Sequence, residues 1–258
     1  MTSHATQHRT RTALAWLLAL ALLRGTSALA QQPDSGSDVT VQVSAGLGIG
    51  TREMQRAIAA GLQSIDAGMF PAADLGMRVD VNAQSRLSWS VLTRYQTTLY
   101  DVVQEHPPLA PPSEVHVRSH HVELGLEPTW HSGNPDDWAL GLNVGYCLRI
   151  FWTDVHNLAT PRQMLTGPYV RPEFELPFLE RFLLRVGPEL FWILTMDQKL
   201  RRTGEQTPGI ALGFQAQLSV QLTTHYGLEL LYRESHAVGF ENLTDIERFL
   251  TLSFTGRF

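Results

Sequence analysis

Apolar and polar side chains alternate along most of this chain. The last thirteen residues show the pattern well: Leu250, Leu252 and Phe254 alternate with Thr251 and Ser253. Successive side chains of a strand point to opposite faces, so this stretch predicts a strand with one apolar face. The alternation recurs nine more times and predicts ten strands in all. They lie near 39–49, 74–81, 86–95, 121–130, 138–150, 168–176, 182–192, 210–222, 226–233 and 246–258.

The lengths of these runs and of the connections between them favour a membrane protein. Most runs have about 10 to 14 residues, whereas strands of soluble proteins average about 5 to 6 and tilted membrane strands need about 9 to 11. The connections alternate between short and long. Short turns fall near 82–86, 131–137, 177–181 and 223–225, and long ones near 51–70, 100–114, 151–165, 195–207 and 235–245. Short periplasmic turns, long external loops and an even strand number are typical of outer-membrane barrels.

The final run ends on an aromatic residue, Phe258, and resembles the closing strand of a bacterial outer-membrane β-barrel. The resemblance is to this class of proteins and not to one family. It implies an all-β fold, a closed antiparallel transmembrane barrel in which 246–258 pairs with 39–50. It also implies contact with outer-membrane lipid and with the barrel-assembly machinery, through the strand that ends at Phe258.

The start of the chain predicts export. Arg9 and Arg11 precede the apolar run Ala13–Leu23, and Ala28-Leu29-Ala30 supplies a small-x-small cleavage pattern. We therefore interpret residues 1–30 as a signal peptide, 31–38 as a flexible lead-in and 39–258 as the barrel domain. The alternative for the first segment is a core helix. The apolar run is too short for a membrane helix, and no other stretch is apolar for long, which excludes a helical membrane protein.

In each run, the residues that share the alternation of the apolar side chains are expected to face outward, toward lipid, and the others inward; we call this outward and inward parity. Aromatic residues of outward parity gather at both predicted ends of the strands. Amphipathic rings favour the headgroup level of a bilayer, so two belts are expected of a barrel and not of a soluble β-sandwich, the alternative fold. The predicted periplasmic belt is Trp89, Trp130, Trp138, Phe182, Tyr226 and Phe258, and the external belt is Tyr95, Tyr146, Trp152, Trp192 and Tyr232. Four in-strand prolines oppose this interpretation, because each removes a ladder hydrogen bond. They are Pro128, Pro168, Pro172 and Pro188, and bulges or strand ends are the two explanations.

Charged residues of inward parity nearly balance, with eight arginines against nine carboxylates. The arginines are Arg78, Arg86, Arg94, Arg149, Arg171, Arg185, Arg233 and Arg257. The carboxylates are Asp74, Asp80, Glu123, Glu127, Glu173, Glu175, Glu189, Glu229 and Glu247. Buried charges require partners, and a barrel of eight strands barely leaves room for side chains, so ten strands give a narrow lumen. We expect a salt-bridge plug, and the alternative is a small selective pore lined by the same charges.

Composition excludes further classes of function. Cys147 is the single cysteine, so no internal disulfide is possible. The formal net charge of −5 gives no basic footprint for nucleic acid. No cofactor is implied.

Three patterns suggest chemistry, each incompletely. Asp154-Val155-His156 resembles the Asp-x-His of omptin proteases, but the Asp-x-Asp of that family is missing. Histidines that suit a transition metal cluster in predicted external regions, without a carboxylate or cysteine that completes a ligand pattern; they are His106, His116, His120, His121 and His156. Ser119 beside His120 and His121 is a local candidate for a lipid hydrolase.

The connection 51–70 has a helical apolar period, because Met54, Ile58, Leu62 and Ile65 follow one another at spacings of four, four and three. We expect a helix there that covers the barrel mouth, lies on lipid or receives a partner. For the whole chain the preferred hypothesis is a non-enzymatic barrel with a structural, adhesion or ligand-binding role. A narrow channel is second and a rim hydrolase third.

Overall fold

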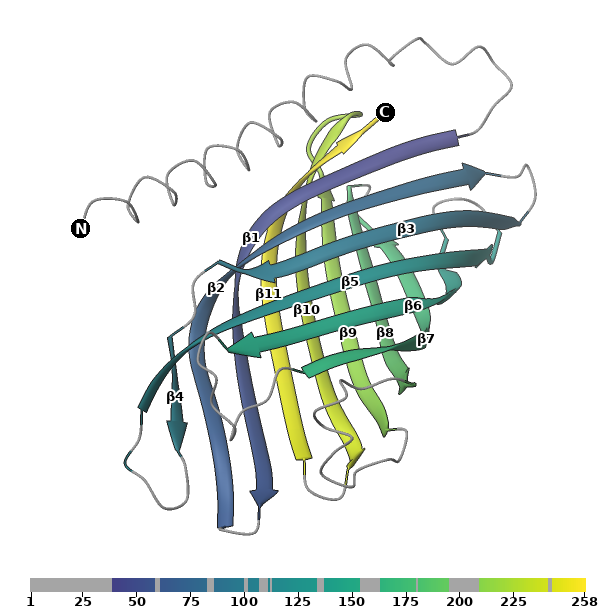
Figure 1. Cartoon of the computed structure of the whole chain (residues 1–258). Helices are drawn as coiled ribbons and strands as arrows, with labels where there is room; N and C mark the ends of the chain where they lie inside the picture. The colour runs from purple at the N-terminus through teal and green to yellow at the C-terminus, as the bar shows by residue number, and fades with distance from the viewer. Residues whose placement is uncertain are drawn as a thin grey trace. The chain divides into compact units, whose positions relative to one another are not determined.

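A computed structural model describes residues 39–258 apart from 59–60, 83–85, 100–101, 107–110, 112, 134–136, 154–162, 180, 195–208 and 241–242. The predicted signal peptide and lead-in lie outside the described residues. The described part consists of eleven strands (Figure 1). They are β1 (Val39–Ile58), β2 (Gly61–Asn82), β3 (Leu87–Thr98), β4 (Val102–His106), β5 (Ser113–His131), β6 (Ala139–Thr153), β7 (Gln163–Phe178), β8 (Phe182–Ile193), β9 (Gly209–Gln221), β10 (Tyr226–Phe240) and β11 (Leu243–Arg257).

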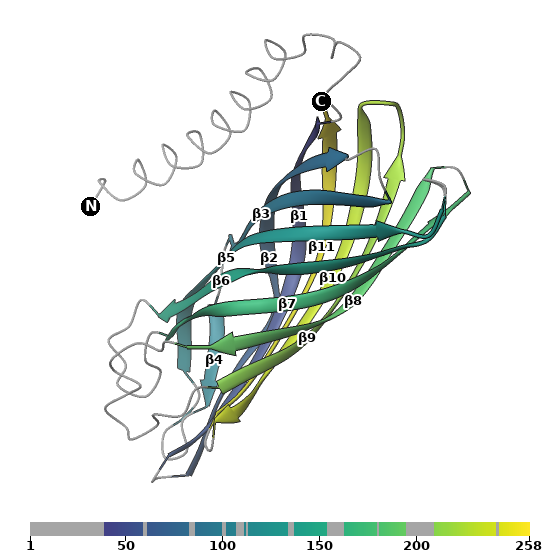
Figure 2. The ribbon, with the colours of Figure 1, turned by 90° about the vertical axis from the view of Figure 1, so that its right-hand side faces the viewer.

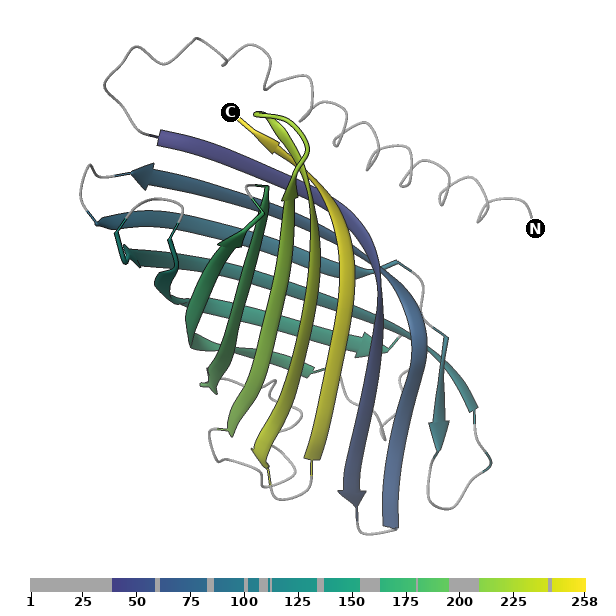
Figure 3. The same ribbon diagram turned by 180° about the vertical axis from the view of Figure 1, so that it is seen from behind.

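Ten of these strands close into an antiparallel barrel, and β4 is an added short strand. Strands that follow one another in sequence pair around the ring, and β1 closes it by pairing with β11. Ala45 of β1, for example, lies opposite Phe254 of β11 on one side and Leu75 of β2 on the other. Figure 3 shows β1 and β11, the two ends of the barrel sequence, side by side. The short β4 pairs with β2 and β5 beyond the end of β3. The predicted fold and the predicted closure by the last strand are therefore confirmed.

We call the end where β1 begins and β11 ends the terminal rim, and the opposite end the loop rim. The strands run obliquely along the barrel (Figure 2). Several continue well past their predicted ends toward the loop rim: β1 reaches Ile58, β5 begins at Ser113 and β10 reaches Phe240. Among the described residues, no helix is long and apolar enough to cross a membrane.

The predicted helix in 51–70 is wrong. Residues 51–58 continue β1, and 61–70 begin β2, with Gly61 at a positive φ of 131°. The backbone groups of 51–56 pair with β11 on one side and with β2 on the other. The helical spacing of four apolar residues does not outweigh hydrogen-bonded strands on both sides of the segment. A helix gains most of its stability from packing one face against the rest of the protein, so spacing alone does not determine the structure.

The prolines are accommodated without a bulge. Register shifts occur at Gly50/Arg52 and at Ala237/Phe240, away from all four prolines. In the β7–β8 ladder, pairing stops after Val170↔Leu190 and resumes in the same register at Phe174↔Val186. Counting inward from these pairs places Pro172 opposite Pro188. The two residues that lack an N–H group therefore face each other. On its other side, Pro172 is still in register with β6, and Pro188 with β9.

The outward face of the ten barrel strands is uncharged from the terminal rim to a level near the loop rim. Large apolar side chains such as Leu47, Leu124 and Leu252 are more than half exposed there. Outward charges begin toward the loop rim, for example at Arg118 on β5 and Glu234 on β10. A lipid-facing surface requires such a band.

The predicted belt aromatics lie at the expected ends of their strands. Most are two-fifths to one-half exposed on the outward face, and neighbouring rings pack, as Trp130 does edge-to-face on Trp138 at 5.4 Å. Tyr95, Phe182 and Tyr232 are half-buried, Phe258 directly follows β11, and the side chain of Trp152 lies outside the described residues.

Candidate functional site: the filled lumen

Buried charges fill the lumen from near the terminal rim to the loop rim. Nearest the terminal rim, Arg78 donates to Asp80 at 2.6 Å and to Glu127 at 3.0 Å, and Arg185 lies 2.7 Å from Glu175. Arg78 and Glu127 thus join β2 to β5 past β3, and Arg185 and Glu175 join the neighbouring strands β8 and β7. Guanidinium partners stabilise these buried carboxylates, while the second oxygen of Glu127 has no hydrogen-bond partner among the described residues.

Arg94 forms a second crossing. It donates through Nε and Nη2 to both oxygens of Asp74, at 2.8 Å each, and through Nη2 to Glu229 at 3.1 Å. Asp74 is fully buried. The bidentate geometry fixes the guanidinium plane, so β2, β3 and β10 are joined through one side chain.

Glu189 is the centre of the network. Its carboxylate accepts hydrogen bonds from Arg149 at 2.9 Å, from Arg171 at 2.8 Å and from Arg233 at 3.0 Å. Arg233 also pairs with Glu123, and Arg171 pairs with Glu173 at 2.7 Å. The carboxylate therefore holds three guanidiniums from three strands.

A mixed apolar and charged layer seals the lumen toward the loop rim. Arg52 donates to Asp245 at 2.9 Å and lies 3.8 Å from Glu247, while its guanidinium stacks 4.1 Å above the ring of Phe151. Around it lies a buried apolar cluster that inward parity alone did not predict. It includes Met54, Phe70, Val117, Phe151, Leu165, Phe191, Ile193 and Phe249.

Inward glycines make room for these rings. A Cβ at Gly50 would lie 2.4 Å from the ring of Phe70, and one at Gly125 would lie 2.4 Å from the Tyr169 hydroxyl. Only glycine permits so close an approach of ring to backbone. Inward glycines next to inward aromatics on neighbouring strands were the sequence signal for a packed interior.

Among the described residues, the network joins ten carboxylates to seven guanidiniums. We name this set the lumen network: Arg52, Arg78, Arg94, Arg149, Arg171, Arg185, Arg233, Asp74, Asp80, Glu123, Glu127, Glu173, Glu175, Glu189, Glu229, Asp245 and Glu247. Arg52 and Asp245 were missed because they fall in segments interpreted as loops. Arg86 and Arg257, predicted as inward charges, are exposed near the terminal rim and make no described ion pair.

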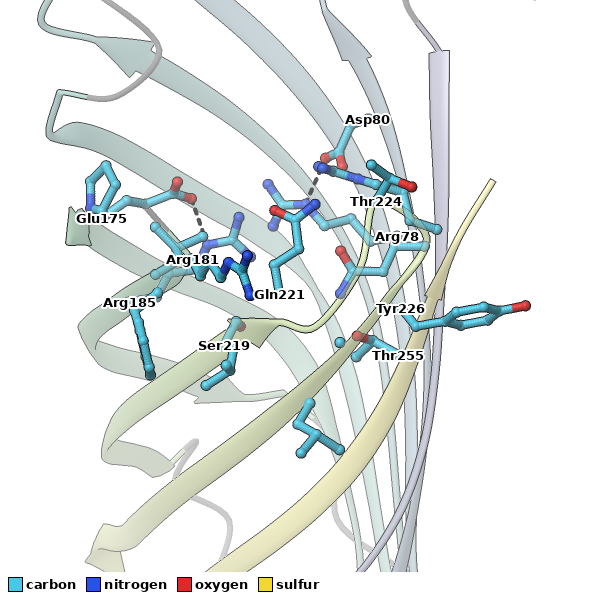
Figure 4. A pocket seen from close by; sticks show the side chains of 18 of the residues that line it. Arg78, Asp80, Glu175, Arg181, Arg185, Ser219, Gln221, Thr224, Tyr226 and Thr255 are labelled. Carbon is cyan, nitrogen blue, oxygen red and sulfur yellow. Dashed lines mark hydrogen bonds and ion pairs between the residues drawn. The ribbon is translucent and has the colours of Figure 1, made fainter. Parts of the chain in front are cut away.

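A polar cavity, which we call the vestibule, lies between the lumen network and the terminal rim. Its volume is about 430 Å³, and Figure 4 shows Arg181, Arg185, Gln221 and Ser219 on its wall. The next cavity along the lumen, beside Arg94 and Arg171, holds about 60 Å³, and the one below the loop rim about 10 Å³. The cavities thus shrink along the barrel, and the vestibule ends at the network.

Strand alternation places the adjacent His120 and His121 on opposite faces, so these two do not bind one metal ion together. His120 faces outward, where its Nδ1 lies 2.9 Å from the hydroxyls of Tyr95 and Thr97. His121 faces inward, with Nε2 3.0 Å from Glu123 and 3.1 Å from the thiol of Cys147.

His121, Glu123 and Cys147 form a buried group whose ligand atoms lie within 4.8 Å of one another, which is a possible metal geometry. Guanidiniums already occupy it: Arg233 pairs with Glu123, and Arg171 lies 3.7 Å from the second oxygen of Glu123. A cation there would face two positive charges at contact distance. The group is better explained as part of the plug.

The hydrolase candidates do not assemble in the described residues. Ser119 faces inward and donates to Glu247 at 3.3 Å, while His120 faces outward. His121 shares the inward face with Ser119, but its Nε2 lies beside Glu123 and Cys147. Asp154 and His156 lie outside the described residues.

An outward ion cluster marks the end of the uncharged band on β10 and β11. Glu234 accepts hydrogen bonds from Tyr232 and His236, and Arg248 lies between Glu234 and Glu53, 3.5 Å and 3.1 Å away. The Tyr232 hydroxyl, followed by His236 and Arg248, lowers the pKa of Glu234. This carboxylate is therefore ionised at neutral pH.

Comparison with known proteins gives a fold and no family. No protein-family model matches the sequence, and neither does any curated protein. Among solved structures, the outer membrane protease OmpT from Escherichia coli is similar over 87% of this chain and 99% of that chain, with a TM-score of 0.52 and 11% identity. At this identity the likeness establishes the fold, which is that of the bacterial outer-membrane β-barrels.

More distant barrels match with lower scores. The translocator domain of the autotransporter NalP from Neisseria meningitidis covers 95% of this chain and 97% of its own length, with a TM-score of 0.42 and 11% identity. Neisserial surface protein A covers 86% and 98%, with a TM-score of 0.35 and 12% identity.

Proposed function

We propose that this chain is a sealed, non-enzymatic outer-membrane β-barrel that serves a structural, adhesion or ligand-binding role at the cell surface. The observation that carries the proposal is the filled lumen. Every carboxylate of the lumen network pairs with a guanidinium, and the mixed layer around Arg52 and Phe151 covers the network toward the loop rim. A solute path would require several buried ion pairs to break together, at a cost of several kcal/mol each.

The location in the outer membrane is part of this proposal. The uncharged outward band, the two groups of aromatics and the fold support it. In this placement, residues 1–30 direct export, the terminal rim faces the periplasm, and the barrel-assembly machinery receives the last strand with Phe258. Outer-membrane lipid then covers the band.

Two other functions compete less well. The vestibule of about 430 Å³ favours a narrow channel, but Arg78, which lines it, pairs with the buried Glu127, and the next cavity along the lumen holds only about 60 Å³. The fold shared with a protease favours a rim hydrolase. Three observations oppose it: the sequence has no Asp-x-Asp, His120 faces away from Ser119, and the inward His121 contacts Glu123 and Cys147.

Solute entry into vesicles tests the proposal. The mature chain is refolded into liposomes, and swelling in an isotonic solution of a small sugar is followed by light scattering beside an open porin. The proposal predicts swelling no faster than in empty liposomes. Sugar-dependent swelling that scales with protein content would contradict it and favour the channel.

A further inference from the structure

Strand β5 carries a row of basic side chains on its outward face. His116, Arg118 and His120 share outward parity, and Arg118 is exposed. The row begins one outward position beyond Val122, which lies opposite Tyr95 of the aromatic belt. These side chains therefore follow the end of the uncharged band directly, at the level where lipid headgroups meet a barrel wall.

The neighbouring strands place no charged residue in register with this row. The residues in register with it are uncharged: Val102 opposite His116, Trp152 opposite Arg118, and Thr97 and Ile150 opposite His120. In the described part of the chain, no carboxylate lies within ion-pair distance of Arg118. Glu114, at the next outward position beyond His116, bounds the row toward the loop rim.

The ring of His120 is held in place. It stacks on Tyr95 with ring centroids 6.1 Å apart, and its Nδ1 lies within hydrogen-bond distance of two hydroxyls. When Nδ1 accepts from Tyr95, the ring proton of a neutral imidazole is on Nε2, which is then a donor. A guanidinium and an oriented imidazole two positions apart suit a phosphate group.

Arg248, another outward arginine near the loop rim, differs from Arg118 because it has carboxylate partners. Arg248 on β11 lies 3.1 Å from Glu53 and 3.5 Å from Glu234. Two carboxylates neutralise it, so a phosphate would gain little there. The two arginines therefore form a matched pair for experiment, one with carboxylate partners and one without.

We propose that the outward row His116–Arg118–His120 binds the phosphorylated sugar headgroup of an outer-leaflet glycolipid. The inference rests on the proposed placement, with the loop rim outside. In that placement the row lies at the outer leaflet, beside lipids whose headgroups carry phosphate on a glucosamine disaccharide. Each arginine near an anionic membrane surface contributes about 1 kcal/mol, which corresponds to about a fivefold change in affinity.

Native mass spectrometry of the refolded, full-length mature protein in detergent tests this site. The probes are a diphosphorylated glucosamine-disaccharide lipid, its dephosphorylated form, phosphatidylglycerol and inorganic phosphate. We expect one tightly bound diphosphorylated lipid, about fivefold weaker binding by Arg118→Gln, and unchanged binding by Arg248→Gln. The dephosphorylated lipid should bind weakly to all three proteins.

Equal binding of the diphosphorylated lipid by wild type and Arg118→Gln would overturn the proposal. So would equal binding of phosphatidylglycerol or of the dephosphorylated lipid, or competition by inorganic phosphate at the lipid's own concentration. Heat-modifiable migration in gels confirms that each variant is folded. Conductance of the same samples tests the sealed lumen independently of this site. If the barrel conducts and still binds the lipid through Arg118, the sealed lumen is contradicted and the lipid site is not.

Discussion

Pro172 and Pro188 face each other across the seam between β7 and β8, where the hydrogen-bond ladder is interrupted without loss of register. In lipid, unsatisfied backbone groups cost several kcal/mol, so the missing hydrogen bonds weaken the pairing of β7 with β8 at this point. On the lumen side of the same seam, the adjacent residues Arg171 and Glu189 also lie opposite each other, and their side chains form an ion pair of 2.8 Å. The charge network thus ties the two strands together where the backbone does not.

Replacing Glu189 by Gln should destabilise the barrel strongly. The substitution keeps the shape but leaves Arg149, Arg171 and Arg233 facing a neutral group, and removing one partner of a buried ion pair costs about 3–5 kcal/mol. Urea unfolding in detergent or lipid, followed by tryptophan fluorescence, measures the free energy of unfolding.

The matched control is Glu53→Gln. Glu53 pairs with Arg248 on the outside and is half-exposed, and exposed pairs contribute about 0.2–1 kcal/mol. Equal effects of the two substitutions would show that the pairs at Glu189 do not hold the β7–β8 seam.

Stability should fall in acid partly through Glu234. Hydrogen bonds from Tyr232 and His236 lower its pKa below the ordinary value of 4.5. A group with a lowered folded pKa stabilises the folded state at pH above its unfolded pKa, and this contribution is lost as the pH falls through the folded pKa. Wild type should therefore be more stable than Glu234→Gln at pH 7, and the difference should shrink below about pH 4.5. Unfolding curves at several pH values measure it, and a difference that stays constant with pH would refute the assignment.

Chemical modification of the single cysteine, Cys147, tests whether the lumen is closed to solutes. Cys147 is 1% exposed within the lumen, so a membrane-impermeant maleimide should not modify it in the folded barrel and should modify it after unfolding. In a Cys147→Ser background, Ser219→Cys on the vestibule wall should react while folded. Mass spectrometry counts the adducts. Rapid labelling of native Cys147 would mean that the lumen is open.

Alternation was sufficient to predict the fold, since ten amphipathic runs of membrane length permit few arrangements other than a barrel. Parity also assigned Arg94, Glu123 and Glu189 to the interior. Which carboxylate meets which arginine depends on register around the whole ring, as the contact of Arg94 with both Asp74 and Glu229 shows. Sequence spacing along one strand does not contain that information.

The errors arose where local pattern and pairing disagree. The spacing of Met54, Ile58 and Leu62 imitates a helix, yet β11 and β2 hydrogen-bond to this segment along both edges. Because these residues were assigned to a loop, Arg52 and the apolar layer around it were missed. His120 and His121 were grouped by adjacency, whereas a strand places neighbours on opposite faces.

Single-channel recording in planar bilayers tests the sealed lumen most directly. Wild-type protein, inserted and shown to be folded by its heat-modifiable migration, is predicted to give no conductance steps at moderate voltage in molar potassium chloride. A combined Arg171→Ala, Glu189→Ala and Arg233→Ala variant that still folds should conduct, because it removes the side chains that cross the centre of the lumen. Steady, voltage-independent steps from the wild-type barrel would contradict the account.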